Sequence, residues 1–130
     1  MAMSYYVKLQ VYWDGPGYDL LDKKACQRVF SRVEEYIRGP QADAKSREIY
    51  GEIGYPATDW LGEFRSAFAG KGGNIKGLEK RWVASLLRYV SRCFPGVIFA
   101  ARGIGEEFDD VWVLWYRDGR RVRSPSRGKR

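Results

Sequence analysis

The chain has 130 residues, which is the length of one ordinary domain. Hydrophobic residues make up 45% of it and charged residues 30%, a balance typical of a folded protein and not of a disordered chain. The absence of histidine excludes Ser-His and Cys-His nucleophile pairs and most zinc sites.

The net charge of +7 is concentrated at the C-terminal end. Seven basic residues and one acid, Asp118, lie between Arg117 and Arg130, so this end accounts for six of the seven net charges. The remainder of the chain is nearly neutral. A basic end raises the affinity for polyanions, nucleic acid included, and a solvated, solubilising end is the simpler interpretation.

The first element is a strand, because apolar and polar residues alternate from Tyr5 to Trp13. Its expected core-facing residues are Val7, Leu9 and Val11. The run Asp14-Gly15-Pro16-Gly17 then predicts a turn. A helix is expected from about Leu20 to Arg38, with Asp19 as its cap and Gly39-Pro40 as its stop.

The middle of the chain predicts a strand and two helices. Residues 48–55 indicate an edge or strongly twisted strand, and residues 60–68 a short helix. Gly70 to Asn74 is expected to be a flexible connection between helices. A longer helix is predicted from about Ile75 to Cys93, ended by Phe94-Pro95-Gly96.

The last part predicts a hairpin. A strand over 97–102 leads into an acidic loop over 103–110. The strand over 111–117 is apolar on both faces, which favours a central position in a sheet. Asp118-Gly119 predicts a type I′ turn, so residues 120–123 are expected to pair back as a short basic strand.

The expected order is therefore β-α-β-α-α-β-β, an α+β fold similar to ferredoxin-like domains. We expect an antiparallel sheet of four to five strands, with the helices over 20–38 and 75–93 on one face. The domain would span residues 1–123, and residues 124–130 would form a basic, disordered tail.

The sheet face turned away from these helices is the first candidate site. Either register of the strand over 111–117 places aromatic residues on that face, and exposed aromatic patches mark partner sites. The short helix over 60–68 could instead cover it. The candidate partner-binding residues here are Tyr6, Lys8, Tyr12, Trp112 and Tyr116.

Basic side chains on the two long helices form a second candidate surface. They recur at helical spacing, so neighbouring helices would join them into one basic surface facing the acidic loop, although a solvated helix face explains them equally. These residues are Lys24, Arg28 and Arg32 on the first helix, and Arg88 and Arg92 on the second.

Binding of RNA or single-stranded DNA is the alternative function. Sheet aromatics could stack bases while cations contact phosphates, although the strand over 97–102 lacks the usual aromatic signature. The basic residues for this alternative are Arg117, Arg120, Arg121 and Arg123.

No pattern indicates catalysis, a cofactor or a metal. Carboxylates such as Glu48, Glu52 and Glu63 could form a metal-dependent hydrolase, but their spacing does not require it. Cys26 and Cys93 fall on apolar helix faces, so we expect free thiols in a reducing compartment. No signal peptide or membrane span is apparent, so a cytoplasmic protein is expected.

The final hairpin resembles that of small ferredoxin-like proteins from phages and mobile elements. The resemblance is carried by Phe94-Pro95-Gly96-Val97, Gly105-Glu106-Glu107 and Asp110-Val111-Trp112. It implies an inhibitor of host machinery, such as an anti-CRISPR protein, with no cofactor and no catalytic site. The expected partner is a protein or ribonucleoprotein, with self-association into a homodimer as the alternative. The basic tail departs from the acidic character of many such inhibitors.

Overall fold

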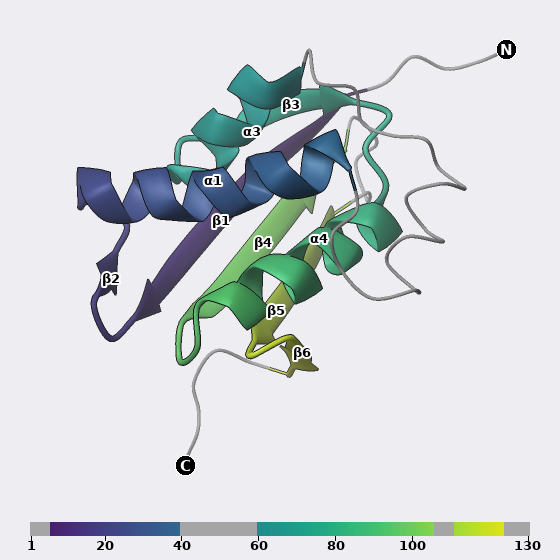
Figure 1. Cartoon of the computed structure of the whole chain (residues 1–130). Coiled ribbons are helices and arrows are strands. Elements are labelled where there is room, and N and C mark those ends of the chain that lie inside the picture. The colour runs from purple at the N-terminus through teal and green to yellow at the C-terminus, as the bar shows by residue number, and fades with distance from the viewer. Residues whose placement is uncertain (1–5, 40–59, 106–110, 124–130) are drawn as a thin grey trace, which may run out of the picture.

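The computed structural model describes residues 6–39, 60–105 and 111–123, which form an antiparallel sheet packed against helices (Figure 1). The predicted α+β class is confirmed. The strand predicted over 48–55 and the tail over 124–130 lie outside the described residues. The elements are β1 (Tyr6–Gly15), β2 (Tyr18–Asp19), α1 (Lys23–Arg38), α3 (Leu61–Phe68), β3 (Gly73–Lys76), α4 (Lys80–Cys93), β4 (Ile98–Ile104), β5 (Val111–Arg117) and β6 (Arg120–Val122).

The sheet has the strand order β2-β1-β4-β5-β6, and β3 pairs with the first half of β1. The central strand is β4, which pairs along its whole length with both β1 and β5. Strand β5, for which a central position was predicted, has a neighbour on each side: it pairs with β4 along its whole length and with the three-residue β6 at one end. Both faces of β5 are apolar although the described helices cover one of them.

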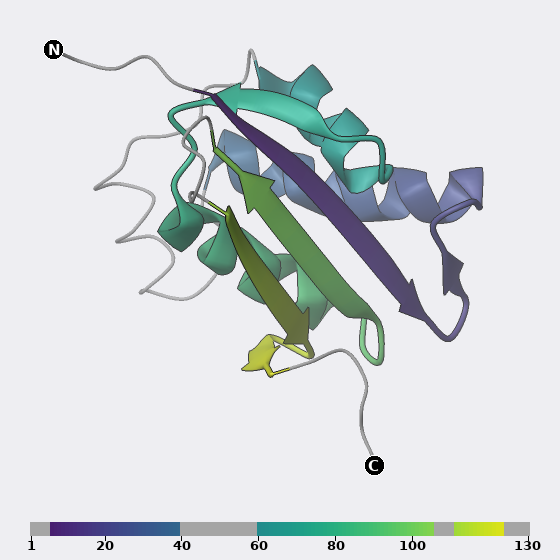
Figure 2. The same cartoon turned by 180° about the vertical axis from the view of Figure 1, so that it is seen from behind.

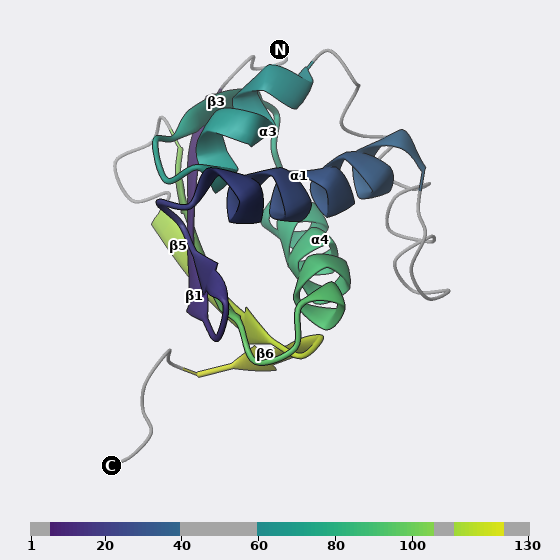
Figure 3. The same cartoon turned by 60° about the vertical axis from the view of Figure 1, so that its left-hand side comes forward.

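The helices α1, α3 and α4 lie on the same face of the sheet, which gives two layers (Figures 1 and 3). The core fills the space between these layers. The predicted inward residues of β1, Val7, Leu9 and Val11, are each at most 1% exposed. Between α1 and α4, the ring of Tyr36 meets that of Trp82 at 5.3 Å, and its hydroxyl is hydrogen-bonded to Ser85.

Helix α1 begins three residues later than predicted. Asp22 is its cap, and the side chain of Asp22 accepts a hydrogen bond of 3.0 Å from the Lys24 amide. Asp19 does not cap the helix because it belongs to β2, which pairs with Asp14 and Gly15. The predicted end at Gly39 is confirmed.

The region predicted as a flexible connection contains a strand. β3 begins at Gly73, and its Ile75 pairs with Val7, so the helix predicted from Ile75 begins at Lys80. Four residues are too few for a periodic pattern to reveal. Gly73 is required because a side chain there would clash with the backbone of Glu63.

The hairpin of β5 and β6 has the predicted turn. Asp118 and Gly119 both have positive φ, 54° and 79°, as a type I′ turn requires. The turn is fixed to the neighbouring elements by two hydrogen bonds. The Gly119 amide donates to Ser91 Oγ at 2.9 Å, and the Gly96 amide donates to Asp118 Oδ1 at 2.9 Å.

Candidate binding surface

No described helix lies on the second face of the sheet, which we call the open face (Figure 2). Strand alternation places on it the predicted Tyr6, Lys8 and Tyr12 of β1, together with Gln10 and Asp14. The register between the strands then identifies which residues of β4, β5 and β6 share this face.

An apolar row crosses the open face from strand to strand. Tyr12 pairs with Ala100, Ala100 with Trp115, and Trp115 with Val122, so one row spans four strands. Aliphatic side chains continue this surface on both sides of the row. They are Ile98, Ile104, Val111 and Val113.

The apolar residues of the open face are accessible. Tyr12 is 45% exposed, and Val111 and Val113 are 51% and 37% exposed. Two hollows flank the row. One, of about 240 Å³, is lined by Tyr12, Ile98 and Ala100 among others, and the second, of about 350 Å³, by Trp115, Val122, Arg121 and Arg123.

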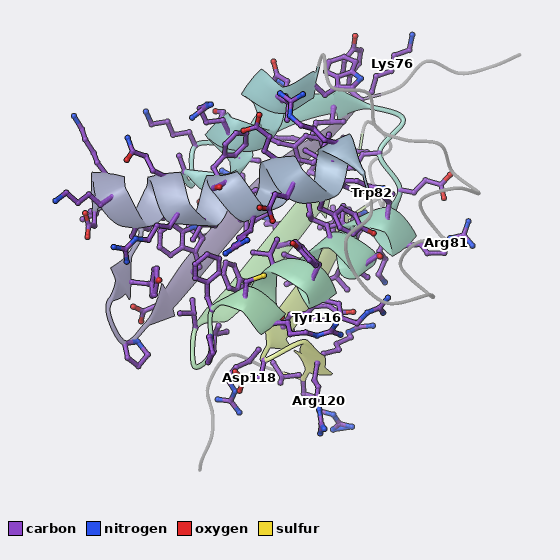
Figure 4. The ribbon with its side chains drawn as sticks, viewed as in Figure 1. Lys76, Arg81, Trp82, Tyr116, Asp118 and Arg120 are labelled. Carbon is purple, nitrogen blue, oxygen red and sulfur yellow. The ribbon has the colours of Figure 1, made fainter. Side chains whose placement is uncertain are left out.

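The charged residues of this face are mostly basic. Over the described residues of β1, β3, β4, β5 and β6, the register places five cations on this face together with the acid Asp14. The cations are Lys8, Lys76, Arg102, Arg117 and Arg120. Figure 4 shows Lys76 and Arg120 extending away from the body of the protein.

The short helix α3 does not cover the open face. Its Phe64 and Phe68 are buried on the side of α1 and α4, and the indole of Trp13 donates a hydrogen bond of 2.9 Å to the carbonyl of Phe68. Trp60, just before α3, meets Tyr6 edge to face at 6.1 Å between ring centroids. This contact lies at one end of β1 and leaves the apolar row uncovered.

Two of the predicted face residues lie on the other side of the sheet. Tyr116 pairs with Phe99 and is 6% exposed beneath α4, and Trp112 lies against Gly103. The aromatic residue that β5 contributes to the open face is Trp115 instead. The sequence shows that the residues of β5 alternate between its two faces. The register with β1 is needed to decide which of these two sets lies on the open face.

The predicted basic residues of the helices form two groups. Lys24, Arg28 and Arg32 line a groove between α1 and the end of α4. Arg92 lies on another flank of α4, against the β5–β6 turn, since a Cβ on Gly119 would stand 3.0 Å from Arg92 Nε. The expected single basic surface is therefore divided, and the acidic residues 106–110 lie outside the described residues.

A hydrogen-bonded cluster fixes Arg32 at the edge of the groove. Arg32 donates to Glu35 at 3.0 Å, and the Tyr89 hydroxyl donates to the same carboxylate at 2.9 Å. The bonds from Tyr89 and Arg32 lower the pKa of Glu35. Burial and the bond to Glu35 raise the pKa of Tyr89 to about 12.

Cys26 and Cys93 are half-buried and are not joined by a disulfide, and the Cys26 thiol donates a hydrogen bond of 3.1 Å to the Leu20 carbonyl. Burial raises the pKa of Cys93, although nearby Arg32 acts in the opposite direction. Over the described parts of the chain, no group of three or more Cys, Asp or Glu side chains is placed to hold a metal. None of the described helices has the length and apolar character to cross a membrane.

Comparisons with protein-family models, with curated proteins and with solved structures gave no match to this chain.

Proposed function

We propose that this protein is a non-catalytic binding protein that docks on a protein or ribonucleoprotein through the open face of its sheet. The observation that supports this most strongly is the apolar row from Tyr12 to Val122, which no described helix covers. Tyrosine, tryptophan and arginine around a hydrophobic centre are the usual energetic anchors of protein interfaces.

The chemistry of the face favours a protein partner over bases. Stacking requires flat aromatic surfaces, whereas Val111 and Val113 offer exposed aliphatic groups that suit the side chains of another protein. The five cations around the apolar row favour an acidic rim on that partner.

The inhibitor role implied by the final hairpin's resemblance to mobile-element proteins belongs to this proposal, as do the ferredoxin-like order and a cytoplasmic location. An inhibitor that blocks host machinery acts by contact alone. The open face would supply that contact and would need no reactive group.

The test measures the affinity of the wild type and of two variants for a purified partner. A protein captured by the immobilised chain is identified, purified and titrated by calorimetry against the wild type and against Tyr12→Ala/Trp115→Ala. One anchor residue contributes about 2 kcal/mol or more, so Kd should rise by at least roughly 30-fold even if only one of the two is an anchor.

Leu21→Ala is the matched control, because Leu21 is 89% exposed and lies in the turn between β2 and α1, outside the strands of the sheet. It should leave Kd within about twofold. Equal affinity of the double variant and the wild type would overturn the proposal. If the wild type forms a homodimer and the double variant does not, the partner of the open face is a second copy of this chain.

Nucleic-acid binding is a second candidate, supported by one observation. The β5–β6 hairpin brings its arginines next to Arg92, so basic residues distant in sequence share one corner of the molecule. A charge-driven complex weakens steeply with salt. Retention on heparin and a steep salt dependence, both lost in Arg120→Ala/Arg121→Ala, would favour this candidate over the first.

A further inference from the structure

A large hollow lined by described residues lies away from the open face. It is a groove of about 770 Å³ between α1 and the C-terminal end of α4, within the usual size of a small-molecule site. Its lining comes from β2, α1, α4 and the residue after α4. The lining residues are Tyr18, Lys24, Gln27, Arg28, Ser31, Arg32, Glu35, Cys93 and Phe94.

Three cations stand in line along this groove. Lys24, Arg28 and Arg32 are four residues apart on α1, which places successive ones about 6 Å apart along the helix axis. Glu35 is the acid of the lining, so the groove has a net charge of +2. A phosphate monoester has a charge of about −2 at neutral pH and several acceptor oxygens.

The cluster around Glu35 prepares Arg32 for binding. Nη1 of Arg32 donates to both carboxylate oxygens of Glu35, at 3.0 and 3.2 Å, and Tyr89 holds that carboxylate from α4. The guanidinium is therefore oriented before a ligand arrives, which reduces the entropy lost on binding. Gln27 and Ser31 add neutral hydrogen-bonding groups between the cations.

Aromatic rings from two other elements also line the groove. Tyr18 and Phe94 meet edge to face with ring centroids 5.1 Å apart. A flat ring system can pack against such a pair while a group attached to it reaches the cations.

We propose that this groove binds a ligand in which a phosphate monoester lies next to a flat ring system, which is the chemistry of a nucleotide. Arg28, Arg32 and Lys24 would hold the phosphate, and Tyr18 with Phe94 would contact the ring. The lining of this groove shares no residue with the open face, so the site is independent of that face and of the function proposed for it.

The test is a titration of the isotope-labelled full chain, followed by NMR, with AMP, adenosine, inorganic phosphate and a 5′-phosphorylated tetranucleotide. AMP should give saturable shifts at the side chains of Arg28 and Arg32. It should bind at least roughly tenfold more tightly than adenosine or phosphate, since each charged hydrogen bond contributes about 1.5–3 kcal/mol.

Lys24→Ala/Arg28→Ala should weaken AMP binding by at least about tenfold. The matched control, Lys71→Ala/Lys80→Ala, removes the same charge from exposed residues outside the groove. It should bind AMP with the affinity of the wild type. If the tetranucleotide binds at the same residues more tightly than AMP, the site is supported. Its ligand is then the 5′-phosphorylated end of a nucleic acid.

Three results would overturn the proposal. Adenosine could bind as tightly as AMP, which would remove the role of the cations. Phosphate could bind as tightly as AMP, which would remove the role of the rings. Shifts confined to residues outside the groove would place the ligand elsewhere.

Discussion

A single residue of β4, Gly103, determines how closely Trp112 of β5 packs against that strand. Gly103 is buried in β4 and pairs with Trp112 of β5, whose indole occupies the space that a side chain at Gly103 would need. The glycine is thus a packing requirement at a position where a strand would ordinarily favour a branched residue.

We expect Gly103→Ala to lower the free energy of unfolding by about 1–3 kcal/mol, because the added methyl group clashes with the indole ring. Urea unfolding followed by circular dichroism measures this change. The double variant Gly103→Ala/Trp112→Phe should lose less than the sum of the single variants, because the smaller ring vacates part of that space.

Gly62→Ala is the control for this prediction. Gly62 is exposed in α3, and a Cβ built on it meets no atom within 4 Å apart from its chain neighbours and the nearby backbone of its own helix. Alanine should stabilise the protein there by about 0.5–1 kcal/mol through helix propensity. Comparable destabilisation by both variants would contradict the packing explanation.

At the scale of elements, α1 and α4 are joined by the cluster of Arg32, Glu35 and Tyr89. The lowered pKa of Glu35 means that its ionised form is more stable in the folded protein than in the unfolded chain. Its contribution to stability is therefore present above its ordinary pKa of 4.5 and is lost as the pH falls through the folded value.

Glu35→Gln should accordingly lose stability at about pH 7 and much less at about pH 3. It should also lower the pKa of Tyr89 from about 12 toward 10, although burial keeps it above that value. Chemical unfolding at both pH values and an NMR titration of the tyrosine rings measure the two effects.

Glu34→Gln removes the same charge from the neighbouring residue, whose partner is Arg38 at 2.7 Å. This variant should leave the Tyr89 titration unchanged. An unchanged Tyr89 titration in Glu35→Gln as well would mean that the contact between α1 and α4 does not form in solution.

The elements with the strongest periodicity could be predicted from the sequence. β1 alternates over most of its length, and Asp118-Gly119 is a specific turn signal, so both were predicted correctly. β2 and β3 have two and four residues, and pairing with β1 rather than local propensity fixes them.

The residues of the open face could be predicted only where they depend on local periodicity and not on pairing between strands. Tyr6, Lys8 and Tyr12 follow from the alternation of β1, whereas the choice of Trp115 over Trp112 depends on register between distant strands. The sequence of β5 also resembles that of a strand buried on both faces. In the described structure, its second face contributes apolar residues to an open surface.

At the scale of the whole molecule, the helices collect on one side of the sheet (Figures 2 and 3). The two candidate sites have different lining residues. The open face presents an apolar row with cations around it, and the groove beside α1 presents aligned cations with an aromatic pair. Variants of one site should therefore leave the other unaffected, because they share no residue.

Accessibility of the open face is the claim on which the proposed function depends. A soluble paramagnetic gadolinium complex broadens the NMR signals of methyl groups that solvent reaches. In the full chain, it should broaden the methyl signals of Val111 and Val113 strongly and spare those of Val11 and Leu114, which are buried. Equal protection of all four side chains would show that the face is covered and would contradict the account.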